Sequence, residues 1–195
     1  MPVRVVIAED EAIIRLDLQE TLEEEGYEVV GSTGRGDEAV TLVRELMPDL
    51  AILDIKMPGM DGITAAKEIA AGRWAAVLIL TAFSQRDLVE QARDAGAIGY
   101  LVKPFQKSDL VPAIEVAIGR FAELRALEQE VHSLEEQLAT RRIVERAKGM
   151  LMDRYALPES EAFSFIQQTA MRQRAKMRKV AEQILDGTIT PPPSS

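Results

Sequence analysis

Short apolar runs alternate with amphipathic stretches through the first 118 residues of the chain. The apolar runs lie near residues 3–8, 28–32, 50–54, 76–81 and 98–102. Between them, apolar positions recur every three or four residues over 12–25, 36–47, 61–71 and 86–95. Runs of the first kind are typical of buried strands and repeats of the second kind of helices. The alternation predicts βα units with right-handed crossovers, forming a five-stranded parallel sheet in a three-layer α/β sandwich.

A long helix is predicted after the fifth strand. Ser108 is suited to cap its N-terminus, and Pro112 falls in its first turn. No glycine or proline interrupts residues 120–148, and Leu or Val recurs at positions 124, 127, 131, 134 and 138. This spacing is that of a coiled-coil seam, although it covers barely two heptads. A dimer interface and a rigid spacer packed against its own chain therefore remain alternatives.

The C-terminal region predicts a small bundle of three short helices. Their apolar positions are Ile143, Val144, Ala147, Met150 and Leu151, then Ala162, Phe163, Ile166 and Ala170, then Met177, Val180, Ala181, Ile184 and Leu185. Residues 155–158 break the first helix, and Asp186-Gly187 ends the third. The predicted organisation is an α/β domain over 1–119, a helical linker over 120–140, a bundle over 141–187 and a disordered tail over 188–195.

Composition narrows the class of protein. The chain has 195 residues, of which 47% are apolar and 28% charged, as is usual for a globular protein. It contains no cysteine, which excludes disulfides and thiolate metal sites. The segment before the first strand is too short for a signal peptide, and no apolar stretch approaches the roughly 20 residues that span a bilayer. We therefore expect a cytoplasmic protein that does not associate with membranes.

The net charge of −9 is divided unevenly along the chain. Residues 1–140 contain 13 Lys or Arg against 26 Asp or Glu, whereas residues 141–179 contain 10 against 4. This asymmetry suggests an acidic domain joined to a basic module that binds a polyanion. A solvated basic helical face is the alternative.

Chemically active side chains end four of the five predicted strands. Glu9-Asp10 follow the first strand, Asp54 ends the third, Thr81 ends the fourth and Lys103-Pro104 follow the fifth. In an open parallel sheet these strand ends meet at one edge, where ligands bind. Three carboxylates, a hydroxyl and an ammonium group gathered there form a site suited to a divalent cation and a phosphoryl group.

The acidic residues fit Mg²⁺, which takes hard oxygen ligands and keeps some of its waters. Asp10 and Asp54 can ligate the ion directly, Glu9 can hold a metal-bound water, and the backbone carbonyl of Lys56 can complete the set. The ion then positions a phosphoryl group for in-line transfer to Asp54.

The remaining strand-end groups can hold that phosphoryl group. Thr81 can donate a hydrogen bond to one of its oxygens, and Lys103 can pair with another. Pro104 helps to fix the loop that carries the lysine, through a cis peptide bond as one option.

These residues alone also allow a phosphate-ester hydrolase with an aspartyl nucleophile. Such an enzyme needs a second acid–base group, and the only histidine, His132, lies in the predicted linker helix, where we expect it to be solvated. We therefore expect the aspartyl phosphate to be a signal, and the protein not to be an enzyme.

The strand-end motifs together resemble the signature of a two-component response-regulator receiver domain. The resemblance covers residues 1 to about 120 and rests on Glu9-Asp10, on DIKMPGMDG over residues 54–62, on Thr81-Ala82 and on Lys103-Pro104. It implies a doubly wound, flavodoxin-like fold and transfer of phosphate from the histidine of a sensor kinase to Asp54 with Mg²⁺. It also implies that Tyr100 is an aromatic switch that turns inward when Thr81 moves onto the phosphoryl group. Glu9 is a departure, because this position often holds Asp, and its longer side chain alters the metal geometry.

The C-terminal segment resembles the ANTAR domain, an RNA-binding output module of bacterial antiterminators. The resemblance covers roughly residues 124–185 and rests on residues 146–152, Glu161-Ala162-Phe163, Ala170-Met171-Arg172 and Val180-Ala181. It implies binding to paired RNA stem-loops that prevents a terminator from forming. A DNA-binding transcriptional regulator and a phospho-switch that contacts only proteins remain the alternatives.

The RNA-contact residues are predicted from charge. They are Arg142, Lys148, Arg172, Arg174, Lys176 and Arg178. Arg172 and Arg174 are the candidates for stacking on bases, whereas Phe163 is expected in the core. Alternatively, some of these cations pair with Glu145, Asp153 or the acidic domain. Phosphorylation of Asp54 is expected to alter homodimerisation or the exposure of this basic surface.

Overall fold

The computed structural model describes residues 2–82 and 86–191. The chain divides into two compact units, Met1–Arg125 and Ala126–Ser195. We describe each unit by itself.

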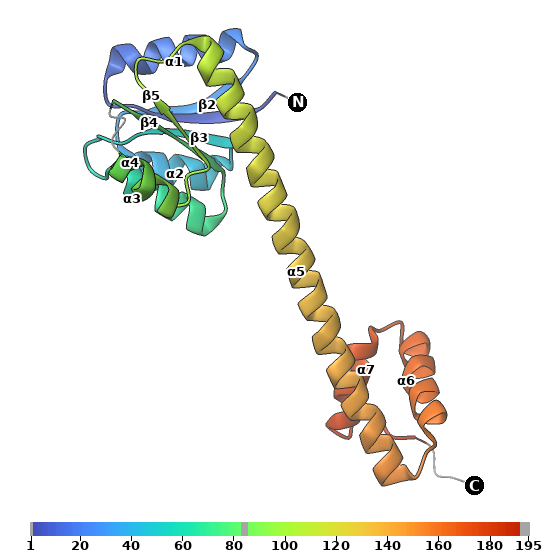
Figure 1. The fold of residues 1–195 in the computed structure, drawn as a ribbon. Coiled ribbons are helices and arrows are strands. Elements are labelled where there is room, and N and C mark those ends of the chain that lie inside the picture. Colours follow the sequence, from blue (N-terminus) through green and yellow to red (C-terminus); the bar gives the residue numbers. More distant parts are fainter. Residues whose placement is uncertain (1, 83–85, 192–195) are drawn as a thin grey trace. The chain divides into compact units, whose positions relative to one another are not determined.

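The first unit is built on a five-stranded parallel sheet. Its strands are β1 (Arg4–Ala8), β2 (Glu28–Thr33), β3 (Leu50–Asp54), β4 (Ala76–Thr81) and β5 (Gly99–Val102). They lie in the order β2-β1-β3-β4-β5 (Figure 1). This order confirms the predicted doubly wound, flavodoxin-like fold. The chain turns one way from β1 and the other way from β3, so a crevice opens between the carboxyl ends of these two neighbouring strands.

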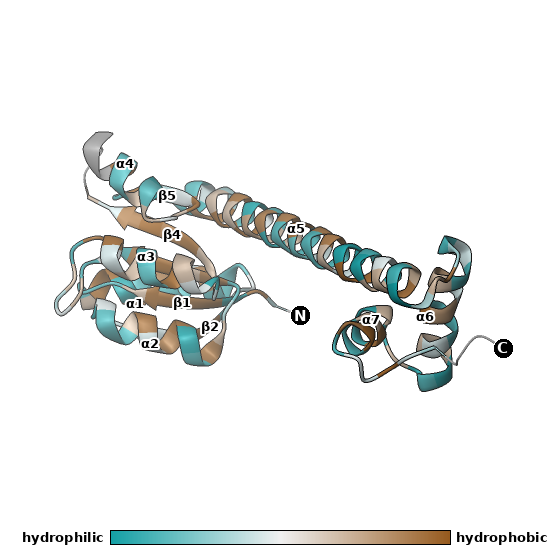
Figure 2. Cartoon of the chain, turned by 90° about the horizontal axis from the view of Figure 1, so that it is seen from below, coloured by the Kyte–Doolittle hydropathy of each residue, from teal (hydrophilic) through white to brown (hydrophobic). Residues whose placement is uncertain are grey.

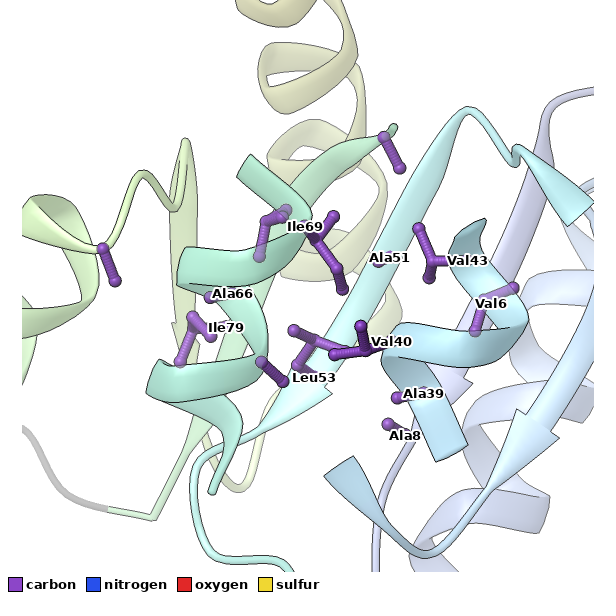
Figure 3. Close-up of a cluster of buried hydrophobic side chains, with 14 of the residues drawn as sticks. Val6, Ala8, Ala39, Val40, Val43, Ala51, Leu53, Ala66, Ile69 and Ile79 are labelled. Carbon is purple, nitrogen blue, oxygen red and sulfur yellow. The ribbon is translucent and has the colours of Figure 1, made fainter. Parts of the chain in front are cut away.

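Helices cover both faces of the sheet. On one face lie α1 (Ala12–Glu24) and the first part of α5 (Lys107–Tyr155). On the other lie α2 (Gly36–Leu46), α3 (Gly62–Gly72) and α4 (Arg86–Asp94). Figure 3 shows part of the second core, where side chains of α2 and α3 meet those of β1, β3 and β4. Because both faces are covered, β3 and β4 are buried along their whole length, which explains their uninterrupted apolar sequences.

Helix α5 is one uninterrupted helix of 49 residues. Ser108 was expected to precede it, but the helix begins at Lys107, and Asp109 in its first turn accepts a hydrogen bond from the Gln106 N–H at 3.0 Å. This is the return half of a capping box. The separate short helix expected over 143–151 is instead the last part of α5, which continues through Gly149 to Tyr155 and is followed by Ala156, with a φ of 53°. The boundaries expected near 119 and 140 thus fall inside one helix.

The buried face of α5 changes along its length. Leu110, Ile114 and Ala117 are buried in the first unit, and Val144, Ala147 and Leu151 in the second. Between them, brown apolar and teal polar positions alternate along the helix in Figure 2. The five seam residues in this stretch, Leu124, Leu127, Val131, Leu134 and Leu138, are 50–59% exposed. Among the described residues, none of the five belongs to the apolar core of either unit.

The second unit is a three-helix bundle formed by the end of α5, α6 (Glu159–Gln173) and α7 (Met177–Leu185). Its core contains Val144, Ala147, Leu151, Ala162, Ile166, Ala170, Val180, Ala181 and Ile184. The tail was expected to be disordered from residue 188. In the structure Ile189 packs against this core, its N–H donates to the Gln183 carbonyl at 3.0 Å, and Pro191 is buried. Residues 192–195 of the expected tail lie outside the described residues.

Within the described parts of the chain, no helix is both long and apolar enough to cross a bilayer.

The separate apolar core of the bundle predicts separate unfolding. Ile166→Ala should destabilise the second unit by about 2–4 kcal/mol, because it leaves a cavity at a fully buried position. Trp74, the only tryptophan, packs in the first unit, so its fluorescence midpoint in urea should stay unchanged while far-UV circular dichroism detects an earlier transition. Ile69→Ala, beside the same core as Trp74, is the matched control and should shift the fluorescence midpoint. A fluorescence shift with Ile166→Ala would contradict independent cores.

Candidate metal and phosphoacceptor site

Three carboxylates meet in the crevice at the ends of β1 and β3. One oxygen from each of Glu9, Asp10 and Asp54 lies within 4.8 Å of the other two. Glu9 is fully buried and Asp54 is 5% exposed, whereas Asp10 is exposed to solvent. The site therefore combines two buried carboxylates with one that is accessible from solvent.

Lys103 is the counter-charge of this acidic group. Its Nζ lies 2.5 Å from Glu9 Oε2 and 2.6 Å from Asp54 Oδ1. Burial lowers the pKa of Lys103, but hydrogen bonds to Asp54 and Glu9 outweigh this effect and hold the pKa above its ordinary value. Burial raises the pKa of Glu9 above its ordinary value, although the hydrogen bond from Lys103 acts to lower it. The Lys103–Pro104 peptide bond is cis.

The loop after β3 holds Asp54 from the other side. The Lys56 N–H donates to Asp54 Oδ2 at 2.8 Å. Lys56 also lines an open hollow of about 860 Å³, together with Asp10, Asp61 and Thr64. Lys56 is thus beside the carboxylates, and the contact that holds Asp54 comes from its backbone N–H.

A glycine is required where this loop turns into α3. A Cβ at Gly62 would lie 1.9 Å from the Asp54 carbonyl oxygen, so only glycine allows the helix to start this close to β3. Asp61 caps α3 by accepting from the Thr64 N–H at 2.9 Å. Burial raises the pKa of Asp61, but its hydrogen bonds with Thr64 bring it below the usual value. The lowered pKa favours the charged form of Asp61, which lines the hollow.

Thr81 and Tyr100 occupy different environments. Thr81 is 2% exposed at the end of β4, and its carbonyl accepts from the Lys103 N–H at 2.8 Å. Tyr100 lies on β5, where it pairs in register with Ile79, and it is 49% exposed. The tyrosine ring is at the surface in this structure, the position from which an inward turn would begin.

The donor set fits a hard divalent cation. All the clustered ligand atoms are carboxylate oxygens, as Mg²⁺ prefers. Glu9, Asp10 and Asp54 each bring one oxygen to this group, and Glu9 and Asp54 are also paired with Lys103. A bound ion would add positive charge to a group of three carboxylates that Lys103 neutralises only in part.

Arg15 is a residue of this site that sequence reasoning missed. Its Nη1 donates to the backbone carbonyl of Glu9 and, at 3.5 Å, to that of Asp10. It also lies against Gly34, where a Cβ would approach Nη1 to 3.1 Å. The guanidinium thus joins the acidic loop to the loop after β2. A cation one turn into the helix that follows an acidic pair was the available signal.

The basic residues of the second unit are not equivalent. Lys148 Nζ lies 2.7 Å from both Glu145 Oε2 and Glu159 Oε1, and hydrogen bonds to these two residues raise its pKa. Arg178 pairs with Glu182 at 2.9 Å. These two cations already have anionic partners, as one of the sequence alternatives anticipated for Glu145.

The basic corner, which we define as Arg172, Arg174 and Lys176, lies at the junction of α6 and α7. All three are exposed, and none forms an ion pair within residues 2–82 and 86–191. Arg142 is likewise exposed on α5. Phe163 was expected in the core but is 42% exposed, because Ala162 and Ile166 occupy the inward face of α6.

Comparison with known families matches both units. Residues 5–115 match the response regulator receiver domain, and residues 132–185 match the ANTAR domain. The transcriptional regulatory protein PdtaR of Mycobacterium tuberculosis is 59% identical over 191 residues, which cover 98% of this chain and 93% of PdtaR. The chemotaxis protein CheY of Thermotoga maritima is 42% identical over 112 residues, covering 57% of this chain and 93% of CheY.

Solved structures match the first unit. The receiver domain of the response regulator NarL from Mycobacterium tuberculosis has a TM-score of 0.58 at 32% identity, and the match covers 60% of this chain and 97% of that domain. The CheX–CheY–BeF₃–Mg²⁺ complex of Borrelia burgdorferi has a TM-score of 0.56 at 28% identity, covering 58% of this chain and 87% of that one.

The contact of Arg15 with the acidic loop predicts a change in metal binding. Arg15→Met should weaken Mg²⁺ binding about tenfold, the lower end of the loss seen when groups that orient metal ligands are removed. Isothermal titration of the unphosphorylated chain with MgCl₂ measures this directly. Arg15→Lys should restore part of the affinity, and Arg44→Met, an exposed cation on α2, should leave it unchanged. Equal affinity of Arg15→Met and the wild type would show that Arg15 does not hold the loop.

Proposed function

The chain belongs to the response regulators that join a receiver domain to an ANTAR domain, and on this basis we propose that it is an RNA-binding transcriptional antiterminator controlled by phosphorylation of Asp54. The phosphodonor is the histidine of a sensor kinase. The RNA ligand is a structured stem-loop. The proposal rests first on the three carboxylates and Lys103 in the crevice of the receiver domain.

Asp54 is placed to act as the nucleophile. One of its oxygens is held by Lys103 and the other by the Lys56 N–H, so the carboxylate cannot rotate away from the crevice. An Asp54 oxygen attacks the phosphorus, and the bond from phosphorus to the histidine nitrogen breaks with its electron pair on the imidazole. Bound Mg²⁺ supplies charge stabilisation for this transfer. The same ion is named in the Borrelia CheY complex with BeF₃, which supports its assignment here.

A phosphoryl group on Asp54 would change the hydrogen bonds of Lys103 and Thr81. The ammonium now bridges Glu9 and Asp54, so a phosphoryl oxygen on Asp54 competes with Glu9 for it. The hydroxyl of Thr81, which ends the neighbouring strand, is the donor for a second phosphoryl oxygen. Movement of Thr81 inward then makes room for Tyr100 to turn from its exposed position. The phosphorylated aspartate is a signal in this scheme, and the chain is not an enzyme.

The basic corner is the RNA contact that the charges favour. Arg172, Arg174 and Lys176 have no ion pair within the described parts of the chain and can neutralise phosphates, whereas Lys148 is already held by two carboxylates. Arginine can also stack on unpaired bases of an RNA loop, and exposed Phe163 can do the same at another point of α6. The control that phosphorylation exerts on this surface is proposed to act through pairing of two chains.

Phosphorylation should depend on Asp54 and on Mg²⁺. Asp54→Asn should incorporate no label from a ³²P-labelled kinase or acetyl phosphate, since the amide is not a nucleophile of comparable strength. EDTA should abolish labelling of the wild type. Asp61→Asn, a change in the same loop that leaves the phosphoacceptor intact, is the control and should retain labelling. Labelling of Asp54→Asn at the wild-type level would place the phosphoacceptor elsewhere.

RNA binding should depend on the basic corner more than on Lys148. The triple change Arg172→Gln, Arg174→Asn, Lys176→Gln should reduce the slope of log K against log salt by about 2, at roughly 0.7 per phosphate contact. Asn is chosen at 174 because that residue has a φ of 51°, a conformation that Asn tolerates. Lys148→Gln should change the slope by much less, because its charge is already paired.

Fluorescence anisotropy with a labelled stem-loop measures these slopes. The same titration with duplex DNA distinguishes an RNA-binding antiterminator from a DNA-binding regulator, because tighter binding to DNA would favour the second. Absence of binding to either nucleic acid at low salt would leave protein interaction as the output.

A further inference from the structure

The loop between β2 and α2 contacts both halves of the carboxylate site. We call it the bridging loop and define it as residues 33–37, which include the first two residues of α2. The carboxylates come from two segments, Glu9-Asp10 after β1 and Asp54 at the end of β3. The pairing of β1 with β3 ends just before these residues. Their spacing therefore depends on what lies against the two segments.

On one side the bridging loop is attached to the segment after β1. The Glu9 N–H donates a hydrogen bond to the Thr33 carbonyl at 3.0 Å. Gly34 lies close to the next residue, since a Cβ placed on it would be 3.6 Å from the Asp10 Cα. The same Cβ would be 3.1 Å from Arg15 Nη1. The bridging loop thus lies directly against the first half of the site.

The bridging loop is also fixed internally. The buried hydroxyl of Thr33 accepts from the Arg35 N–H at 3.2 Å and donates to Glu38 Oε2 at 2.6 Å. The Arg35 guanidinium donates twice to Asp37, from Nε at 3.0 Å and from Nη2 at 2.8 Å. Because these bonds hold the loop in one shape, a displacement on one side of it is expected to move the other side as well.

On the other side the bridging loop touches the loop after β3. A Cβ on Gly36 would lie 2.1 Å from the Met60 carbonyl oxygen, so the two backbones meet with no room for a side chain. The ion pair makes a second contact nearby. A Cβ on Gly59 would lie 2.6 Å from Asp37 Oδ1 and 2.7 Å from Arg35 Nη2.

The loop after β3 connects these contacts to Asp54. The Gly62 N–H donates to the Ile55 carbonyl at 2.9 Å, which closes the loop on itself. Within the closed loop, the Lys56 N–H donates to Asp54 Oδ2 at 2.8 Å. Met60 lies between the two ends of this loop, so a shift of Met60 is expected to move the N–H that holds Asp54.

We propose that the bridging loop sets the spacing between the two halves of the carboxylate site, and that Gly36, Arg35 and Asp37 are positioning residues for phosphoryl transfer to Asp54. They act through the loop after β3, whose Lys56 N–H orients the carboxylate. The proposal deepens the proposed function and rests on its assignment of Asp54 as the phosphoacceptor with Mg²⁺ beside it. Small errors in the placement of a reacting group are costly, since about 1 Å lowers a rate by up to ~100-fold.

Gly36→Ala is the sharpest test of this role. Gly36 has an ordinary φ, and alanine is favoured over glycine in a helix, so the backbone itself accepts the change. The nearest atoms that the added methyl group meets all belong to Met60. Gly119→Ala is the matched control, because it adds the same methyl group in α5 where nothing lies within 4 Å.

The first readout is the amide resonance of Lys56 in the full chain labelled with ¹⁵N-lysine, assigned by its loss in Lys56→Arg. A hydrogen bond to a carboxylate moves an amide proton downfield. Gly36→Ala should move this resonance upfield, whereas Gly119→Ala should leave it unchanged. A merely structural role for Gly36 would lower the stability of the first unit without moving this one resonance.

The second and third readouts are Mg²⁺ affinity and phosphorylation rate. In isothermal titration with MgCl₂, Gly36→Ala should bind the ion about tenfold more weakly, as when groups that orient metal ligands are disturbed. Its phosphorylation by acetyl phosphate at saturating Mg²⁺ should slow at least tenfold. Gly119→Ala should match the wild type in both.

The ion pair provides an independent variant. Arg35→Met should weaken Mg²⁺ binding roughly two- to fivefold, a smaller effect because the side chains of the pair are 45% and 46% exposed. Arg35→Lys keeps the cation and should restore most of the affinity. Arg44→Met, which removes an exposed cation elsewhere on α2, should have no effect.

An unchanged Lys56 resonance together with unchanged Mg²⁺ affinity in Gly36→Ala would overturn the proposal, and so would equal losses in Gly119→Ala. Trp74 fluorescence reports whether the first unit is folded. If Gly36→Ala is unfolded, Arg35→Met decides, because its exposed side chain leaves the core intact. Equal Mg²⁺ affinity of Arg35→Met and the wild type would then overturn the proposal.

Failure of the proposed function is a separate result. A wild type that takes no label, or an Asp54→Asn chain that takes it normally, would contradict the proposed function. Normal labelling of the wild type, with Gly36→Ala identical to it in all three readouts, would contradict only the role of the bridging loop.

Discussion

The ion pair of Lys103 with Glu9 and Asp54 is the interaction on which the receiver domain depends. Three carboxylates within 4.8 Å of one another are unfavourable at the sheltered end of a sheet, because burial and mutual repulsion both oppose their charged forms. One ammonium in contact with two of them offsets part of this cost. The remaining negative charge is what makes the crevice attractive to a divalent cation. The same group of charges therefore holds this end of the sheet together and attracts the cation.

The sheet topology brings together residues of this ion pair that are far apart in the sequence, and the last of them lies close to α5. Glu9, Asp54 and Lys103 follow or end β1, β3 and β5, and Thr81 ends the strand between the last two. Only three residues separate Lys103 from the first residue of α5. That helix continues without a break into the core of the ANTAR domain. A change at Asp54 or Lys103 thus has a short covalent path to the helix that also forms the first side of the bundle.

Charged residues occupy two different settings in the chain. In the crevice the charge is buried and paired, which fixes the geometry of Asp54. On the basic corner the charges are exposed to solvent. The uneven distribution of charge in the sequence is therefore functional at a finer scale than the two halves of the chain, since Lys148 belongs to the basic half but serves the packing of α5 against α6.

The sequence by itself determined the strands, the fold class and the strand-end residues of the crevice. These follow from local periodicity and from the rule that parallel strands end at one edge, so neighbours along the chain were sufficient. Only the tertiary structure decided which charges are paired, because Lys148 meets Glu159 across two helices and Arg15 reaches the carbonyl of Glu9 across a loop. The tertiary structure also decided that Phe163 is exposed, that Ile189 joins the bundle and that the seam lies open. Burial and ion pairing depend on what approaches a side chain through space, and a repeat of three or four residues shows which face of a helix is apolar but not what covers it.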